Sequence, residues 1–424
     1  MNRREFLTGA ALAATGALTR AEGSPAKPNA AGAPTISRKG VKPRNRRPYA
    51  GIDWSKVIQI NGTTHMHQHA DVLDTVKEHN IEFLTLSNYY PSMPAPALKD
   101  MTSPKGLPTS DWPVMVNGKR VAGPFDWNKI VSQWEEEIPE ADRKAWPPYP
   151  FRSPSRQFNP KSLPTGLLEG PNAEHHGFKL KNGRSAGRLH LCAPGSAFAS
   201  GTFDARNRKR TVSHGYCSGS GEFWGTAIDR MIAKLIVPDG GGVTINHPTW
   251  THIDKSLLLE LLDWDPRVLG LEVFESGTNS ENYWDWVLAT GRQCFGFFVP
   301  DHGMRNKDFG VCVLLVQERT VEACLRAYRS GNFYGSAHGL GELRFTSIRF
   351  DGTTIRAETD KPARLEVITA RGVRKTVEGR SVEWKCPKDN NDREGSAVEI
   401  FARIRATALD GCGERLFTQA SMLV

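Results

Sequence analysis

Short apolar segments of this chain repeatedly end in a polar group that carries histidine, and no other feature narrows the possible folds as much. These groups, with the segments before them, are His65-x-His67 after 57–60, Asn246-His247-Pro248 after 242–245, and Asp301-His302 after 294–299. Such apolar runs are typical of buried strands, and parallel α/β sheets gather the carboxyl ends of their strands at one edge. The pattern therefore predicts an α/β fold with a histidine-rich site at that edge.

Helical patterns separate these strands, as expected for parallel α/β units. The predicted helices are 71–80, 225–236, 257–262, 282–290 and 321–330, and further strands are predicted at 81–86, 268–274 and 311–316. From about residue 341 onward the pattern changes to period-two runs at 345–350, 353–359, 364–369 and 398–406. These runs predict a separate small all-β sandwich over residues 339–424.

A long segment interrupts the α/β pattern. Residues 91–165 are rich in Pro and Trp and show little helical or strand periodicity. Long irregular loops in compact domains are usually functional. We therefore expect this insertion to form a lid or a wall of the site.

The spacing of the histidines favours metal binding. Two residues at i and i+2 on an extended strand point the same way, so His65 and His67 can share one cation. Glu174 and His190 are natural partners, because a carboxylate can bridge two cations. The predicted ligands are His65, His67, Glu174, His190, His247, Asp301 and His302. Nitrogen and oxygen ligands without thiolate suit one or two divalent ions of Zn, Mn or Fe.

Cysteine does not enter this ligand set. The seven cysteines form no C-x-x-C pair and so give no zinc-ribbon pattern. Cys192, two residues after His190, is interpreted as a packing residue, and we expect buried free thiols.

Together these motifs resemble the PHP (polymerase and histidinol phosphatase) superfamily of metal-dependent phosphoesterases. The resemblance is carried by His65-x-His67 as its first motif, Glu174 with His190 as its glutamate and following histidine, Asn246-His247-Pro248 as its His-Pro motif, and Asp301-His302 as its closing pair. It implies a distorted (β/α)7-type barrel over residues 51–338 that carries out metal-dependent hydrolysis. Within the superfamily the chain is most similar to the carbaryl-hydrolase-like metallohydrolases, which also carry a terminal sandwich.

Two motifs depart from the superfamily's pattern. Thr63-Thr64 stands where Asp-Leu usually precedes the first histidine, and Ser87-Asn88-Tyr89 stands where Thr-Asp-His is usual. The second change removes a metal ligand and argues against a three-metal cluster. Asp301 and His302 also adjoin, whereas one residue usually separates the closing pair, so either of them can be the closing ligand.

The predicted mechanism uses a cation-activated water that attacks a phosphorus or an acyl carbon. The predicted catalytic residues are Glu174, Asp301, His302 and His175, of which His302 or His175 protonates the leaving group. The predicted substrate-binding residues are Asn88, Tyr89, Arg188, Asn246 and Arg305, with the two arginines neutralising an anionic group.

The main functional prediction is a phosphoesterase that acts on a small-molecule phosphoester. Two alternatives stay open: the same site hydrolyses a carboxylic or carbamic ester or an amide, or a metal-poor barrel binds a ligand or glycan. An amidohydrolase barrel also opens with His-x-His, but it requires a lysine at a mid-barrel strand end, and the sequence offers no convincing one.

The net charge of +9 does not indicate a nucleic-acid partner. The first fifty residues hold ten of the 55 basic and two of the 46 acidic residues, which leaves 45 against 44 in the rest of the chain. A nearly neutral folded part lacks the basic surface that nucleic-acid binding requires.

The excess charge belongs to a predicted export signal. Arg3-Arg4, Phe6-Leu7, a small apolar run over 8–18 and a cleavage-like Thr19-Arg20-Ala21 resemble a twin-arginine signal peptide over residues 1–21. It predicts the twin-arginine translocase as a partner and a periplasmic or secreted protein. Residues 22–50 read as a Pro/Ala/basic linker. No apolar run reaches the length of about 18 residues that a membrane span needs, so no stable anchor is expected.

Overall fold

The computed structural model describes residues 44–67, 76–77, 80–85, 87, 114–116, 119–121, 166–196, 198, 222–275, 277–301, 310–338, 343–387 and 399–423. The predicted signal peptide, most of the predicted insertion and the predicted site residues Asn88, Tyr89, His302 and Arg305 lie outside these ranges. Within them, none of the helices has the length and apolar character needed to cross a membrane.

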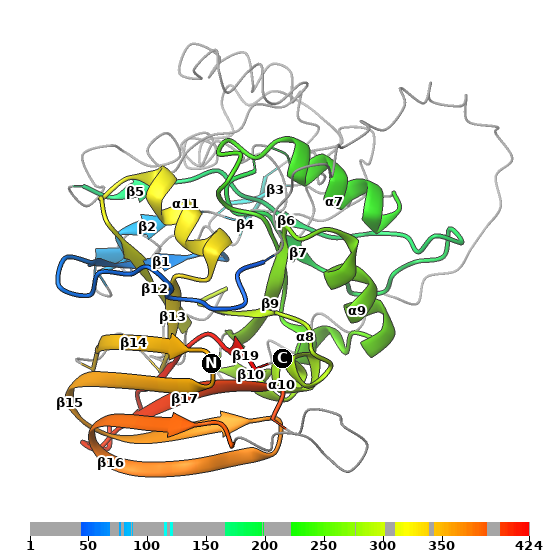
Figure 1. Cartoon of the computed structure of the whole chain (residues 1–424). Coiled ribbons are helices and arrows are strands. Elements are labelled where there is room, and N and C mark those ends of the chain that lie inside the picture. Colours follow the sequence, from blue (N-terminus) through cyan, green and yellow to red (C-terminus); the bar gives the residue numbers. More distant parts are fainter. Residues whose placement is uncertain are drawn as a thin grey trace, which may run out of the picture. The chain divides into compact units, whose positions relative to one another are not determined.

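Two mixed sheets form the framework of the described chain (Figure 1). The strands of the first sheet are β1 Ile58–Thr63, β2 Phe83–Leu84, β5 Leu168–Glu169, β12 Gly310–Val316, β13 Phe333–Ala337, β14 Phe345–Asp351, β15 Thr354–Thr369, β16 Gly372–Lys385, β17 Phe401–Ala408, β18 Arg415–Phe417 and β19 Ser421–Met422. Those of the second sheet are β6 Glu174–His175, β7 Leu191–Cys192, β8 Val243–Ile245, β9 Val268–Glu275, β10 Thr278–Asn279 and β11 Phe295–Val299. A separate hairpin pairs β3 Val114–Val116 with β4 Lys119–Val121.

Most of the described helices contact a strand close to them in the sequence, and α8 contacts the more distant β10. They are α7 Trp224–Ala233, α8 Pro248–Thr251, α9 Lys255–Trp264, α10 Glu281–Ala289 and α11 Val321–Ser330. Helices α9 and α10 contact β9, while α7 contacts β8 and α11 contacts β12. The first turn of α11 is capped by the Thr320 hydroxyl, which accepts from the Ala323 amide, and Gly331 ends the helix in the left-handed region with φ 74°.

The pairing directions confirm a mixed α/β chain but depart from simple parallel alternation. The order of the first sheet is β14-β15-β17-β18-β13-β12-β1-β2-β5, and that of the second is β10-β9-β8-β7-β6, with β11 on β9. The pairs β1–β2, β2–β5, β8–β9 and β9–β11 are parallel, whereas β1–β12, β6–β7 and β7–β8 are antiparallel. These pairings do not by themselves close the (β/α)7 barrel that the resemblance implies.

Strands β9 and β11, which end at the site, leave no room for a side chain at Gly270. A Cβ atom built on Gly270 would lie 1.9 Å from the carbonyl oxygen of Phe295. Since no side chain fits at that distance, glycine is required for this pairing.

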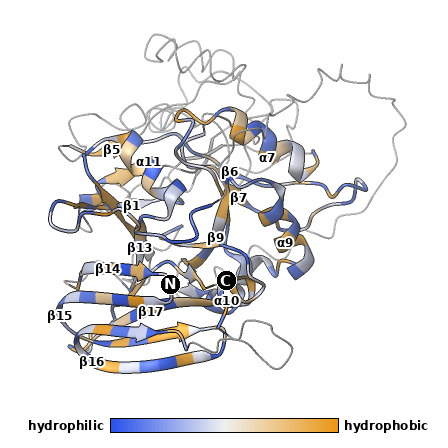
Figure 2. Ribbon diagram, viewed as in Figure 1, coloured by the Kyte–Doolittle hydropathy of each residue, from blue (hydrophilic) through white to orange (hydrophobic). Residues whose placement is uncertain are grey.

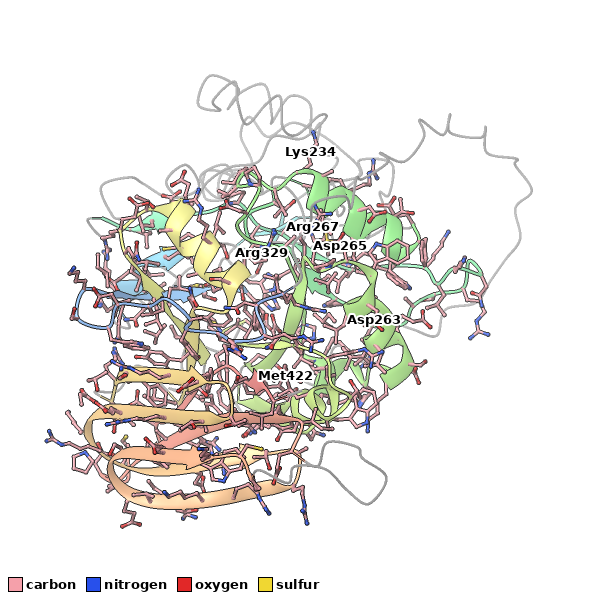
Figure 3. All side chains as sticks on the ribbon, viewed as in Figure 1. Lys234, Asp263, Asp265, Arg267, Arg329 and Met422 are labelled. Atoms are coloured by element: carbon pink, nitrogen blue, oxygen red, sulfur yellow. The ribbon has the colours of Figure 1, made fainter. Side chains whose placement is uncertain are left out.

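Close to the start of β9, the Asp265 carboxylate accepts from the Arg267 guanidinium at 2.8 Å, and Figure 3 places Arg329 near this pair. Burial and the charge of Arg267 lower the pKa of Arg329 to about 10.

The C-terminal strands continue the first sheet. The period-two runs are strands, as predicted, and β18 pairs with β13 through Leu416 and Ser336. Hydrogen bonds of one sheet therefore cross the predicted boundary at residue 339, because the edge of β13 away from β12 accepts β18. The charge-rich strand β16, where hydrophilic and hydrophobic positions mix (Figure 2), was not predicted. Tyr49, inside the predicted linker, is also buried in the core that these strands share.

One buried cation joins the C-terminal strands to a helix of the second sheet. Arg403 on β17 is 1% exposed, and its guanidinium donates to Asp285 and Glu281 on α10 at 2.9 Å each. Its Cζ atom also lies 4.9 Å from the centre of the Trp284 ring. A fully buried arginine with two carboxylates is costly to disrupt, because its loss leaves Asp285 without this cation and Glu281 with Arg405 alone, at 3.3 Å.

Candidate metal centre

A short parallel bridge sets the positions of the first ligands. Met66 pairs with Asp301 just beyond the ends of β1 and β11. The Asp301 amide donates to the His65 carbonyl at 3.1 Å, and the His67 amide donates to the Asp301 carbonyl at 3.3 Å. His65 and His67 flank the bridged residue, so their rings lie on the same face of the extended segment.

Ser87 ties these segments to the strand of Glu174. The Met66 amide donates to the Ser87 hydroxyl at 2.9 Å, and the Glu174 amide donates to the Ser87 carbonyl at 3.0 Å. Ser87 belongs to the group that departs from the Thr-Asp-His pattern. In this chain it orders the ligand-bearing segments.

Four donor atoms converge at the first part of the site. His67 Nε2 lies 3.0 Å from Glu174 Oε2, 3.2 Å from His65 Nε2 and 3.3 Å from Asp301 Oδ1. His65 Nε2 lies 3.5 Å from Glu174 Oε2 and 3.2 Å from Asp301 Oδ1. Ligand atoms at bond lengths of about 2.1 Å from a tetrahedral cation lie about 3.4 Å apart. These five distances are close to the value that a tetrahedral site requires, and His65, His67 and Asp301 form one of the groups that could hold a cation.

The tautomer of His65 agrees with this fit. Its Nδ1 atom lies 2.8 Å from Glu272 Oε1, and because a carboxylate only accepts, Nδ1 is the donor, which in the neutral ring leaves the lone pair on Nε2. The other Glu272 oxygen accepts from the His247 amide at 2.8 Å. Glu272 thus orients two predicted ligands, as carboxylates behind metal-bound histidines commonly do. It is fully buried, and the sequence signal for it was a charge inside an otherwise apolar strand.

The second oxygen of Glu174 forms the other part of the site. Glu174 Oε1 lies 2.8 Å from His190 Nδ1 and 3.0 Å from His247 Nε2, and it accepts from the side-chain Nδ2 of Asn246 at 3.1 Å. One carboxylate therefore faces two groups of imidazoles, one through each oxygen. This is the geometry of a bridging ligand between two cations.

The titration behaviour of these side chains reflects crowded opposite charges. Burial alone opposes ionisation, yet the neighbouring histidines hold the pKa of Glu174 well below its usual value. Against the same burial, the bond to Glu174 and the charges of Glu272 and Asp301 raise the pKa of His247 to about 9. Without a cation, the cluster therefore holds negative charge that attracts protons, and a divalent ion can replace them.

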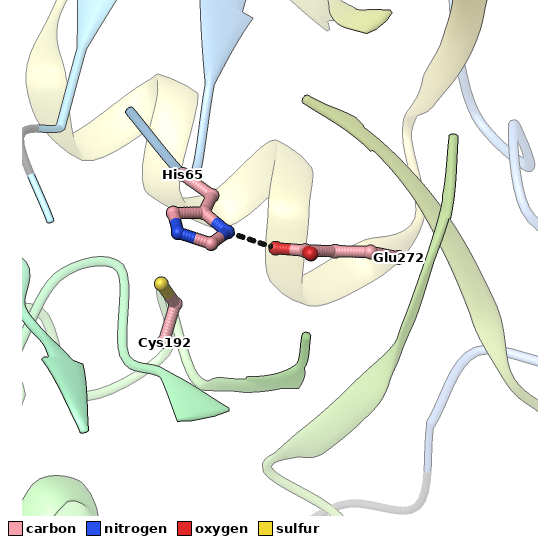
Figure 4. A group of neighbouring side chains, drawn as sticks. All are labelled: His65, Cys192 and Glu272. Carbon is pink, nitrogen blue, oxygen red and sulfur yellow. Dashed lines mark hydrogen bonds and ion pairs between the residues drawn. The ribbon is translucent and has the colours of Figure 1, made fainter. Parts of the chain in front are cut away.

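Cys192 lies beside the ligands but is not suited to join them. Its Sγ atom, His65 and Glu272 form one of the groups whose donor atoms lie within 4.8 Å of one another (Figure 4). Burial raises the pKa of the Cys192 thiol far above its usual value, and the Asn246 amide donates to the sulfur at 3.2 Å. Without a cation the sulfur therefore remains a protonated, buried thiol, as a packing residue would. The other described cysteines are also free, and Cys412 alone among them is exposed.

Two predicted site residues are placed differently from expectation. Asn246 is 1% exposed and bonds Glu174 and Cys192, so its amide positions a ligand, whereas the sequence prediction was substrate contact. His175 follows Glu174 on the same strand and therefore points to the opposite face. Its ring stacks on Phe198 at 5.7 Å, and burial lowers its pKa to about 3. The structure does not bring His175 into the cluster.

Glu275 is a second carboxylate that the sequence reasoning missed. A bulge interrupts the β9–β11 pairing between Phe297 and Phe298, and it resets the alternation of faces along β9. Glu272 and Glu275 consequently lie on one face, although three residues separate them. Glu275 is 5% exposed, and burial together with the charge of Asp301 raises its pKa to about 8.

Glu275→Gln is expected to stabilise the metal-free protein at pH 8 by on the order of 3 kcal/mol, with the gain shrinking toward pH 5. Folding raises the pKa of this carboxyl from 4.5 to about 8, so the native chain keeps its proton longer than the unfolded chain. Wild-type stability therefore falls as pH rises through this range, while a neutral glutamine avoids the loss. Urea unfolding across pH 5–8 tests this, with exposed Glu318→Gln as the control. A difference that does not vary with pH would contradict it.

Comparisons with known proteins add a distant structural likeness. No protein-family model matches the sequence, and no curated protein matches it. Among solved structures, one similar chain is a two-domain protein from Bacteroides vulgatus that contains a predicted PHP-like metal-dependent phosphoesterase. The likeness covers 87% of this chain and 95% of that chain, at 11% sequence identity and a TM-score of 0.37.

Proposed function

We propose that this protein is an exported metal-dependent hydrolase, and specifically a phosphoesterase. The observation that carries the proposal is that His65 Nε2 and His67 Nε2 lie 3.2 Å apart and that each lies 3.0–3.5 Å from both Glu174 Oε2 and Asp301 Oδ1. Nitrogen and carboxylate oxygen atoms gathered in this way are the donor types that hold a divalent cation. The phosphoesterase assignment rests on the PHP-like motifs that supply these atoms.

The proposed ligands form two groups that share Glu174. One cation would be held by His65, His67, Asp301 and Glu174 Oε2, and a second by His190, His247 and Glu174 Oε1. Such cations, when bound, lower the pKa of water toward neutrality and polarise a phosphoryl or acyl group. The donor types suit Zn, Mn or Fe.

Other side chains of the protein are proposed to orient the ligands and to neutralise the charge of the substrate. Glu272 keeps His65 in the tautomer that turns Nε2 inward, and Asn246 fixes the Glu174 carboxylate. Arg188, an exposed cation on the loop before His190, is proposed to bind the anionic group of the substrate. His302, Arg305, Asn88 and Tyr89 remain proposed contributors to proton transfer and substrate binding.

We also propose that the described strands belong to a distorted (β/α)7-type barrel similar to those of PHP metallohydrolases of the carbaryl-hydrolase kind. Two contacts between the sheets support this. The Met66–Asp301 bridge joins the end of β1 to the end of β11, and the Glu174 amide bonds the Ser87 carbonyl beyond β2. Export by the twin-arginine route to the periplasm or the exterior is proposed from residues 1–21 alone.

Metal content and substrate class are tested together. Purified protein is expected to contain one or two Zn, Mn or Fe ions per chain and to hydrolyse phosphomonoesters or phosphodiesters faster than carboxylic or carbamic esters. His65→Ala and His247→Ala are expected to bind less metal and to have kcat/KM values at least about a hundredfold lower. This loss exceeds the usual effect of changing a residue that only hydrogen-bonds a ligand. Protein without stoichiometric metal, or variants with full activity, would remove the metal site from the mechanism. Turnover of carboxylic or carbamic esters alone would assign the alternative hydrolase reaction.

A further inference from the structure

A large exposed aromatic side chain stands next to the candidate metal centre. Trp250 lies on the short helix α8, which begins directly after His247, and is 47% exposed. Trp224 and Trp284, by contrast, are 3% and 0% exposed. An indole left in water gives up apolar burial that the fold obtains from those tryptophans. Exposure alone is common for single apolar side chains, so what surrounds this indole decides its role.

The indole contacts two of the proposed metal ligands. Its ring centre lies 5.0 Å from that of His247 at an interplanar angle of 79°, and 5.7 Å from that of His190 at 56°. Both histidines bond the same oxygen of Glu174. A substrate whose reacting group binds beside His190 and His247 would therefore place its leaving group close to the indole.

A cation shares this surface with the indole. The guanidinium carbon of Arg188 lies 5.4 Å from the centre of the Trp250 ring, a cation–π distance. Arg188 is exposed, and no carboxylate partner for it occurs among the described residues. Its five N–H donors are therefore available to an anion, while the ring beneath limits the orientations of the guanidinium.

We propose that Trp250 and Arg188 select aryl phosphoesters, a substrate class that rests on the proposed phosphoesterase function. The phosphoryl group contacts Arg188 at the metal centre, and the flat leaving group packs on the indole. In the reaction, water's oxygen bonds to phosphorus, the bond from phosphorus to the aryl oxygen breaks, and the leaving oxygen takes up a proton to give a phenol. An alkyl leaving group fits the same chemistry but gains less from the indole.

The test compares phenyl phosphate with butyl phosphate on the metal-loaded protein. Trp250→Ala is expected to lower kcat/KM for phenyl phosphate by about fivefold to tenfold, mainly through KM, and that for butyl phosphate by less than about twofold. Trp250→Phe is expected to keep most of the preference. Trp286→Ala is the matched control, because Trp286 also carries a cation, Lys255 at 4.7 Å, but lies on α10 outside the candidate centre.

A binding measurement separates recognition from chemistry. In calorimetric titrations, Trp250→Ala is expected to bind phenylphosphonate more weakly than the wild type does. Its affinity for methylphosphonate is expected to equal that of the wild type. If Trp250→Ala has the same ratio of kcat/KM for phenyl phosphate to kcat/KM for butyl phosphate as the wild type, selection by Trp250 is wrong. The proposed phosphoesterase function would not be affected by that result. A metal-loaded wild type that neither turns over either ester nor binds either phosphonate would overturn both proposals.

Discussion

Glu174→Gln is expected to lower metal content to less than one ion per chain and kcat/KM by at least about a hundredfold. Glutamine keeps the shape of the side chain but loses the negative charge and one acceptor oxygen. Glu174 contacts four imidazoles through its two oxygens, so the change weakens both proposed cation sites at once. No other described residue has this double role.

Elemental analysis and phosphoester kinetics measure this effect, and two variants set its scale. Glu272→Gln keeps every proposed ligand, and it is expected to lower kcat/KM by about tenfold to a hundredfold. This is the usual effect of changing a carboxylate that orients a metal-binding histidine. Glu414→Gln is the control for burial, since Glu414 is 1% exposed but bonds Ser336 and the Leu343 amide in the C-terminal part of the sheet. Full metal content in Glu174→Gln would refute the bridging role.

Arg403→Ala is expected to lower the free energy of unfolding by about 3–5 kcal/mol. Although burial opposes it, Arg403, Asn279 and Arg405 hold the pKa of Glu281 below its usual value, so this carboxylate is charged in the fold. Removing the guanidinium leaves Glu281 and Asp285 without their shared partner and opens a space beside Trp284.

Urea unfolding measures this loss against a surface pair. Arg356 bonds Glu358 at 2.6 Å, but both side chains are exposed, so Arg356→Ala is expected to cost less than about 1 kcal/mol. Arg403→Lys keeps the charge without the two-pronged geometry and is expected to fall between the two alanine variants. Stability of Arg403→Ala within about 1 kcal/mol of the wild type would show that burial contributes little to this ion pair.

Much of the fold follows from apolar periodicity. The strand predicted at 268–274 is β9, that at 311–316 is β12, and the helix predicted at 321–330 is α11. Strand β16 was missed because charged and polar side chains occupy most of its positions and nearly all of them face water. The two runs predicted at 353–359 and 364–369 belong to one continuous strand, β15. Periodicity also carries no information about strand direction, which is why the antiparallel pairs were not expected.

The candidate site was predictable where ligands follow strands. His65, His67, Glu174, His190, His247 and Asp301 come together as the motifs indicated. Glu272 and Glu275 escaped because each looks like an isolated charge in an apolar strand, and only the bulge in β9 brings both to one face. The role of Asn246 depends on contacts with a strand 54 residues earlier in the chain, which no local pattern encodes.

The bridge between Met66 and Asp301 also determines when the site can exist. Its two sides lie more than half the chain apart in sequence, so no fragment that stops before β11 holds the full donor set. Contacts of such long sequence separation form late, because the entropy of closing the loop must be overcome first. The donor group that includes Asp301 is therefore complete only when the first and last site segments have met, whereas His190, His247 and Glu174 come together without Asp301.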